Sequence, residues 1–145
     1  MNCKLKAKNG FTLIEVLMAM VLIGLAIASL LAAAKSFTSV NAAGSESTTA
    51  EFLIEQIREL TTMTNYGSLY SFDGENYSPP HNAAGGVLNN LAAFSQRITV
   101  ENVSDTDFTA VVPDHGSNFI RVTVKILLNS KEISSESWIR ANISS

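Results

Sequence analysis

Apolar residues fill the first part of the chain almost without interruption. From Val16 to Ala34 there is no charged side chain. As a helix rising ~1.5 Å per residue, this stretch is about 28 Å long, close to the ~30 Å hydrocarbon thickness of a bilayer. Starting the count at Phe11 takes the segment past that thickness. The pattern therefore predicts a helix long enough to span a membrane.

One carboxylate, Glu15, lies within the start of this apolar run. A charged side chain at mid-bilayer costs about 2.5–3.5 kcal/mol on insertion scales. An ionisable residue in a membrane segment is therefore a functional hypothesis in its own right. Glu15 is the first candidate functional residue of the chain.

Further along, the apolar positions narrow to one helical stripe. Between Thr48 and Thr64 they recur at intervals of three and four, with charged residues on the other face. Such an amphipathic stretch has one face to bury. Because no proline lies between Thr12 and Asn65, the pattern predicts one long helix over these residues. The stripe comprises Ala50, Leu53, Ile54, Ile57, Leu60, Thr61 and Thr64.

From Phe94 onward the period changes from helical spacing to two. The alternation is clearest in 119–128, where aliphatic side chains face one way and Arg121, Thr123 and Lys125 face the other. Four strands are predicted, at residues 96–103, 108–112, 119–128 and 133–143. Short links between them indicate an antiparallel meander whose apolar face the stripe would cover. The fold class expected is α+β, one long N-terminal helix packed on a small antiparallel sheet of about four strands.

Residues 65–86 are rich in glycine, proline and aromatic residues, which predicts a structured loop. Its rings, Tyr70 and Tyr77 among them, have two interpretations: they anchor a partner, or they pin the loop onto the sheet. Trp138 falls out of phase with Ile139 in the last predicted strand. It is either an exposed interface anchor or a residue packed under a loop.

Charge and cysteine content narrow the possible functions. The formal net charge is −3, and three of the ten basic residues, Lys4, Lys6 and Lys8, lie before Gly10. Without them, seven basic residues face thirteen acidic ones, a formal charge of −6 that argues against general nucleic-acid binding. Cys3 is the single cysteine, so no intramolecular disulfide is possible.

Candidate catalytic and metal sites are weak. His81 and His115 show no metal-ligand spacing, and no nucleophile or phosphate-loop motif is present, so no enzymatic activity or cofactor is predicted. The oxygen-rich turn 73–76 lacks the ligand spacing of a calcium loop. Calcium at this turn, or at Asp105, Asp107 and Asp114, is kept as a minor alternative to solvated turns.

The N-terminus has three interpretations. A secretory signal peptide would use Ala32 to Ala34 as its cleavage site, but the apolar run is longer than the ~7–15 residues of such segments. A plain single-pass anchor explains the apolar run but not Glu15. The third rests on resemblance: the basic leader followed by Gly10, Phe11, Thr12, Leu13 and Glu15 resembles the processing site of type IV prepilins and of the pseudopilins of type II secretion.

This resemblance implies a specific maturation route. A prepilin peptidase would cleave between Gly10 and Phe11, and the new amine of Phe11 would be N-methylated. The chain would then comprise a leader at 1–10, a transmembrane and assembly helix at 11–34, and a head at 35–145. In the family, the carboxylate corresponding to Glu15 meets the N-terminal amine of a neighbouring subunit. The lysines of the leader would keep the N-terminus cytoplasmic and the head outside.

The function implied is that of a structural subunit, a minor pilin or pseudopilin. Its partners would be other pilin subunits, the peptidase and methyltransferase, and an inner-membrane assembly platform. Residues 50–60 and 121–124 resemble the I class of pseudopilins and the V class of minor pilins. The presence of Glu15 favours a place below the tip, since the tip-most pseudopilin class lacks this glutamate. A major pilin of the shaft and a subunit of a competence pilus are the alternatives.

Overall fold

The computed structural model describes residues 11–143. One α-helix, α1 (Leu13–Met63), is followed by the 3-10 helices η1 (Tyr66–Phe72) and η2 (Asn89–Leu91). The strands are β1 (Asn76–Tyr77), β2 (Phe94–Asn102), β3 (Phe119–Leu128) and β4 (Lys131–Ala141). By their contacts the described residues divide into two compact units between Ala43 and Gly44, and the units are treated separately below. The second unit is called the head.

In the first unit, every described residue from Phe11 to Ala43 is exposed. The helix is long and apolar enough to cross a membrane, and none of its most apolar window is buried. Leucine and isoleucine side chains such as Leu13, Leu22 and Leu30 expose two thirds or more of their surface. An apolar surface of this extent requires a membrane or other helices to cover it. The predicted membrane-length helix is therefore present, as part of α1.

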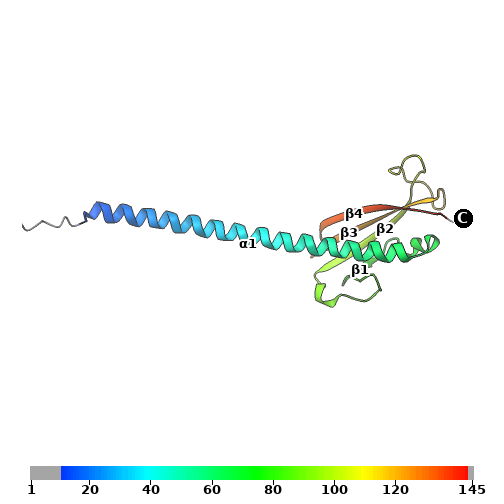
Figure 1. Ribbon diagram of the computed structural model, residues 1–145, viewed down its shortest axis with the longest axis horizontal. Helices are drawn as coiled ribbons and strands as arrows, with labels where there is room; N and C mark the ends of the chain where they lie inside the picture. The colour runs from blue at the N-terminus through cyan, green and yellow to red at the C-terminus, as the bar shows by residue number, and fades with distance from the viewer. Residues whose placement is uncertain (1–10, 144–145) are drawn as a thin grey trace, which may run out of the picture. The chain divides into compact units, whose positions relative to one another are not determined.

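In the head, the four strands form one antiparallel sheet in the order β1-β2-β3-β4 (Figure 1). The β2–β3 register pairs Ile98 with Val124 and Val100 with Val122, so these aliphatic side chains share one face. The buried side of α1 packs against them through Ala50, Leu53, Ile54 and Ile57. The predicted α+β arrangement, a helix on a small antiparallel sheet, is confirmed.

Two buried amides tie the loops to this core. The Gln96 amide donates to the carbonyls of Leu53 and His81, and its oxygen accepts the His81 N–H at 2.7 Å. The Asn102 oxygen accepts from the Tyr70 hydroxyl at 2.6 Å and from the His115 N–H at 2.9 Å. Because each amide is fully buried but hydrogen-bonded, the polar groups add specificity without the cost of an unmade bond.

A side chain from the sheet caps the C-terminal end of α1. Its last turn contains no basic residue. Arg140 of β4 instead donates to the carbonyl of Thr61, and also to that of Thr64 at 3.4 Å. A cation near the C-terminus of a helix satisfies free carbonyls and interacts favourably with the helix dipole. This contact fixes the end of α1 against β4.

The prediction of a strand at 108–112 was wrong. Only an isolated bridge forms there, between Val103 and Val111. The carboxylate of Asp107 accepts hydrogen bonds from both the backbone and the hydroxyl of Thr109, which bends the chain into a turn. The fourth strand is instead the short β1, within the stretch predicted to be a loop.

The pairing of β4 with β3 sets which side of the sheet each residue of β4 faces. In the β3–β4 register, Val122 lies opposite Trp138 and Arg121 lies opposite Ile139. Trp138 therefore shares the helix-covered face with Val122, and Ile139 points to the other side of the sheet, 36% exposed. A register shift between Ile126 and Leu127 accompanies this pairing. The tertiary register, rather than the hydrophobicity of single residues, decides which way β4 faces.

Candidate functional site

The first candidate site is the N-terminal turn of α1. Thr12 precedes the helix, and its carbonyl accepts the N–H groups of Glu15 at 3.1 Å and Val16 at 3.2 Å. The Thr12 hydroxyl also lies 3.4 Å from the Glu15 nitrogen, a long contact. This places Thr12 at the helix cap and Glu15 at the third position, the spacing of a capping box. The sequence prediction identified Glu15 but missed Thr12, although the Thr-x-x-Glu spacing was visible.

Glu15 is exposed and lies in the first turn of the helix. No ion pair of Glu15 occurs among residues 11–143, where all four salt bridges lie in the head. At helical spacing it shares a face with Phe11 and Ala19. A carboxylate here is favoured by the helix dipole and remains available to a cation from outside the subunit. Gly10, the predicted cleavage residue, lies outside the described residues.

The second candidate site is the aromatic part of the head. Tyr66, Tyr70, Phe72 and Tyr77 are half-buried and pack against the core. The Tyr77 ring stacks on that of His81 with centroids 4.2 Å apart, and the Tyr70 ring lies 4.8 Å from that of His115. This geometry matches the interpretation in which the rings pin the loop to the sheet. Partner binding by Tyr70 and Tyr77 stays a prediction.

Burial changes the ionisation of two of these tyrosines. Burial raises the pKa of Tyr66, and the neighbouring Tyr70 adds to this effect. Burial also raises the pKa of Tyr77, with a smaller contribution from the charge of Glu75. Both hydroxyls therefore stay protonated at neutral pH. Among the described residues the Tyr66 hydroxyl is buried without a hydrogen-bond partner.

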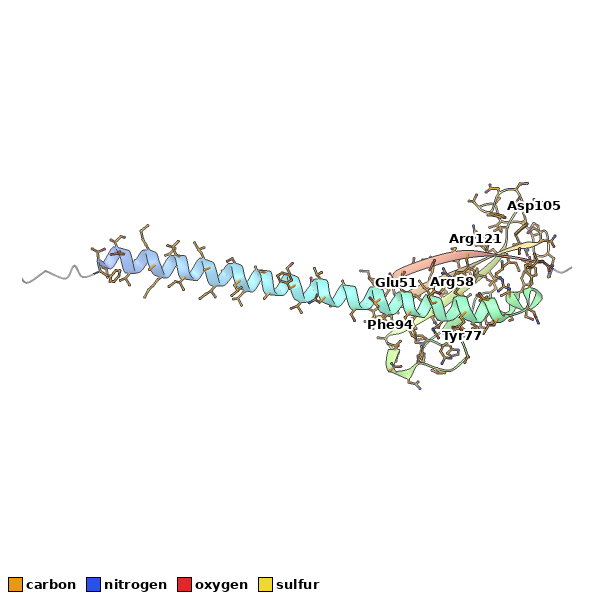
Figure 2. All side chains as sticks on the ribbon, viewed as in Figure 1. Glu51, Arg58, Tyr77, Phe94, Asp105 and Arg121 are labelled. Atoms are coloured by element: carbon orange, nitrogen blue, oxygen red, sulfur yellow. The ribbon has the colours of Figure 1, made fainter. Side chains whose placement is uncertain are left out.

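Trp138 lies at the contact between α1 and β4. The guanidinium of Arg58 lies 5.1 Å above its ring and bridges Glu55 on α1 and Glu136 on β4. Figure 2 labels Arg58 on the helix. The Arg58 cation over the face of the Trp138 ring, with the two carboxylates beside it, stabilises the contact between α1 and β4. The structure places Trp138 in this contact, and its proposed role in an interface with other subunits stays a prediction.

No group of three or more histidine, cysteine or acidic side chains within residues 11–143 could hold a metal ion. Two of the carboxylates in the calcium alternative, Asp73 and Asp107, accept hydrogen bonds from other residues of the head. Asp73 accepts the Val100 N–H at 2.8 Å. Hydrogen bonds from Thr109 hold the pKa of Asp107 below its usual range. Asp107 therefore stabilises its own turn, and Asp73 ties the turn at residues 73–76 to β2.

Comparison with known proteins gives one match. A protein family described as the prokaryotic N-terminal methylation motif matches residues 5–33. No curated protein and no solved structure matches the chain. The matched segment contains the Gly10–Phe11 junction, Thr12, Glu15 and most of the apolar run. It indicates a structural subunit rather than an enzyme, and it fits membrane anchoring through α1. The chain therefore carries the N-terminal prepilin signature that type IV pilins and pseudopilins share.

Proposed function

We propose that this chain is a minor pilin or pseudopilin, a structural subunit of a type IV pilus or of a type II secretion pseudopilus. It is inserted as a precursor with its N-terminus in the cytoplasm and its head outside. Cleavage after Gly10 removes residues 1–10, and Phe11 is then N-methylated. Residues 11–34 anchor the subunit and assemble it, while residues 35–145 form its head. An inner-membrane platform then adds the subunit to an extracytoplasmic filament.

The observation that carries this proposal is the exposed carboxylate at the start of an uncovered apolar helix. Glu15 lies in the first turn of α1, four residues after Phe11; if the helix extended to the mature N-terminus, the two residues would lie about 6 Å apart along its axis. Cleavage would leave a positive amine on Phe11 of each subunit. In an apolar surrounding, the amine of one subunit and Glu15 of the next form a pair that is costly to separate, because either group alone would be buried unpaired. Such a pair fixes the register in which subunits add.

The first test concerns the mature N-terminus. Cleavage at the predicted junction gives a protein that begins at Phe11, which N-terminal sequencing of protein from the native host detects. A start near Lys35 would mean conventional signal-peptide cleavage and would overturn the proposal. As a matched control, Gly10→Arg should leave the full-length precursor in the membrane, because the peptidase needs close approach at this residue.

The second test concerns Glu15. Glu15→Val keeps an apolar helix and an intact cleavage junction, so membrane insertion and cleavage should persist. Incorporation should fail because the amine of the neighbouring subunit loses its partner. The measurement is the ratio of this subunit in sheared filaments to that in membranes. Glu46→Val, which removes another exposed carboxylate of α1, should leave the ratio unchanged. Equal ratios for wild type and Glu15→Val would refute the docking role.

A major pilin and a subunit of a competence pilus remain the alternative functions. Copy number per filament separates a shaft subunit from a minor one. A DNA-uptake subunit requires a local basic patch, and a formal charge of −6 after leader removal leaves few residues to build one.

A further inference from the structure

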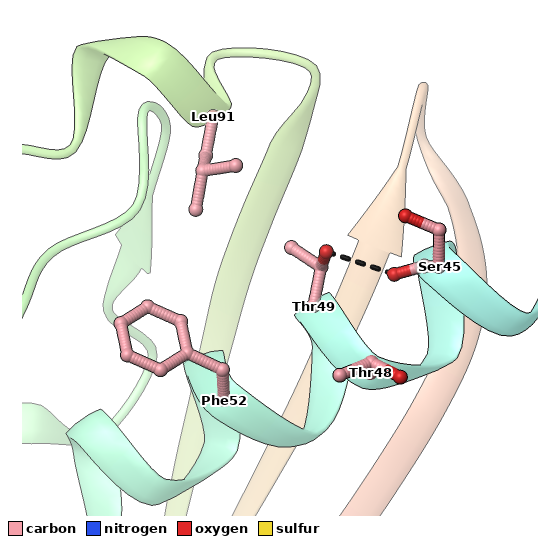
Figure 3. Close-up of a pocket in the computed structure, with 5 residues that line it drawn as sticks. All are labelled: Ser45, Thr48, Thr49, Phe52 and Leu91. Atoms are coloured by element: carbon pink, nitrogen blue, oxygen red, sulfur yellow. Dashed lines mark hydrogen bonds between the residues drawn. The ribbon is translucent and has the colours of Figure 1, made fainter.

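Two hollows on the head differ in chemistry. The larger is a groove between α1 and η2, with a volume of about 520 Å³, lined by Ser45, Thr48, Thr49, Phe52 and Leu91 (Figure 3). The hydroxyls of Thr48 and Thr49 donate to carbonyls of α1 itself, and none of the lining residues is charged. The groove therefore offers a ligand little beyond apolar contact.

The second hollow, which we name the loop cavity, lies in the connection between β2 and β3. It has a volume of about 310 Å³ and is lined by Ser104, Asp105, Val112, Gly116, Ser117, Asn118 and Phe119. The two serine hydroxyls are used in hydrogen bonds within the connection itself. By contrast, no hydrogen bond or salt bridge of the Asp105 and Asn118 side chains occurs within residues 11–143. Their polar atoms are therefore left for a ligand.

The charge of the connection favours a cationic ligand. Residues 103–118 include three exposed aspartates, Asp105, Asp107 and Asp114, and no lysine or arginine. Figure 2 labels Asp105 on this connection. The nearby Arg121 of β3 pairs with Glu101 instead. A hollow with one sign of charge attracts a partner of the opposite sign, so the Asp105 carboxylate suits a cation from outside the subunit.

An apolar surface adjoins the loop cavity. Phe119 lines the cavity, and its ring contacts that of Phe108 with centroids 5.1 Å apart. Phe108 is 45% exposed, and Val111 is 55% exposed. Exposed apolar side chains rimmed by polar groups are typical of protein interaction sites. The cavity and this surface together match a partner that has both a cation and an apolar side chain.

Backbone hydrogen bonds fix the exposed position of Phe108. Its carbonyl accepts from Arg121 at 3.3 Å. On either side, the Ser104 N–H donates to the carbonyl of Ala110 at 2.9 Å, and the Val112 N–H donates to that of Asn102 at 3.0 Å. The ring is therefore held in the open by a braced loop. A surface that is already ordered loses less free energy on binding than one that must first be ordered.

This chain supplies no suitable cation of its own among residues 11–143. An arginine fits the cavity best, because its planar cation bonds a carboxylate through two N–H groups and stacks on aromatic rings. Three of the four arginines, Arg58, Arg121 and Arg140, are already held within the head. Arg97 has no salt bridge, but the residues before and after it in sequence are fully buried. No exposed apolar residue adjoins it to cover Phe108.

We propose that the loop cavity and Phe108 bind a segment of a different protein in which an arginine lies next to apolar residues. The guanidinium donates to the Asp105 carboxylate and to the amide oxygen of Asn118, beside the Phe119 ring. A neighbouring apolar side chain of the partner covers Phe108 and Val111. The contact goes beyond the proposed role as a filament subunit and does not rest on Glu15.

Peptide binding to the full-length protein in detergent micelles tests this proposal. The probes are fluorescein-labelled Gly-Leu-Arg-Leu-Gly and the same peptide with citrulline, an uncharged isostere, in place of arginine. Fluorescence anisotropy up to about 1 mM peptide measures both affinities. The citrulline peptide should bind roughly tenfold more weakly, because it loses the charge-assisted hydrogen bonds. Asp105→Asn should abolish this difference, and Phe108→Ala should weaken the binding of both peptides.

Asp114→Asn provides the matched control. It removes the same charge from the same connection, but Asp114 does not line the loop cavity. The arginine peptide should therefore keep its affinity within about twofold, since exposed charges at a distance are screened. Equal weakening by Asp105→Asn and Asp114→Asn would reveal diffuse attraction and overturn the proposal.

Three other results would also contradict the proposed partner. They are equal affinities for the arginine and citrulline peptides, no binding of either peptide, and self-association of the protein in micelles that Asp105→Asn abolishes. The last result would identify a second copy as the occupant. Because the measurement needs no filament, its failure leaves the Glu15 proposal intact.

Discussion

At the scale of single residues, Tyr66 and Tyr70 show how one hydrogen bond distinguishes neighbouring side chains. Both rings pack against the core from η1. The Tyr70 hydroxyl donates to Asn102 at 2.6 Å, whereas the buried Tyr66 hydroxyl has no partner among the described residues. A buried polar group without a partner keeps its desolvation cost. The hydroxyl of Tyr70 therefore stabilises the head, whereas the hydroxyl of Tyr66 lowers its stability.

We expect Tyr66→Phe to leave the free energy of unfolding unchanged or to raise it by up to about 1 kcal/mol, because it removes only an unpaired hydroxyl. Tyr70→Phe should lower it by about 0.5–1.5 kcal/mol through loss of the bond to Asn102. Urea unfolding of a soluble head fragment that starts at Phe37 measures both. A larger loss for Tyr66→Phe than for Tyr70→Phe would contradict this assignment.

Alkaline pH gives a second prediction for these residues. Burial raises the pKa of Tyr66 and Tyr77 in the folded head. Above about pH 10 the unfolded chain releases these protons first. Stability is therefore fully present below about pH 10 and falls as the pH rises through the folded pKa values. In Tyr66→Phe this alkaline loss should be smaller, with the Tyr77 part remaining. Thermal midpoints of wild type and Tyr66→Phe between pH 8 and pH 11 measure this loss of stability. Equal slopes of the midpoint against pH for the two proteins would refute the role of Tyr66.

At the scale of elements, α1 and the sheet depend on one row of aliphatic contacts. Ile57 is fully buried on α1, as are Val122 and Val124 on β3. On either side of this row, polar contacts connect α1 to β4. Arg58 of α1 pairs with Glu136, and Arg140 of β4 donates to the carbonyl of Thr61. The stripe predicted from helical spacing is thus the surface that the head buries.

Ile57→Ala should lower the free energy of unfolding by roughly 2–5 kcal/mol, as expected for a buried large-to-small change. Glu59→Ala, two residues away on the exposed side of α1, should change it by less than about 0.5 kcal/mol. Thermal and urea denaturation of the head fragment give both values. An unchanged midpoint for Ile57→Ala would mean that the stripe is not the packing surface of the sheet.

At the scale of the whole molecule, the two units require different surroundings: water for the head, and an apolar environment for the first unit. The head has a buried core of its own, while the apolar side chains of the first unit are all exposed. The hydrophobic effect therefore favours transfer of the first unit to a membrane or a bundle of helices. The N-terminal signature at residues 5–33 coincides with this unit.

This division predicts how the protein fractionates. The full chain should remain with membranes after extraction at alkaline pH, because its apolar segment is held by burial and not by charge. The fragment from Phe37 should be found in the soluble fraction. Immunoblotting of the membrane and soluble fractions measures where the full chain and the fragment are found. Release of the full chain by alkaline extraction would show that its apolar helix does not anchor it.

The sequence alone determined the features that depend on local order along the chain. The uninterrupted apolar run, the stripe from Ala50 to Thr61, the alternation of β3 and the position of Glu15 are all periodic or local patterns. Side chains three or four apart in a helix, or two apart in a strand, share a face whatever the rest of the fold does. The long helix, three of the four strands and the prepilin signature could therefore be predicted.

Only the tertiary structure decided what depends on partners distant in sequence. The short β1 exists because Asn76 and Tyr77 meet Arg97 and Gln96, and two residues carry no periodic signal of their own. Trp138 faces the helix because β4 takes its register from β3. The groove between Phe52 of α1 and Leu91 of η2 likewise arises only when the head is folded. Register and packing are set by the sum of many distant contacts, which no local window contains.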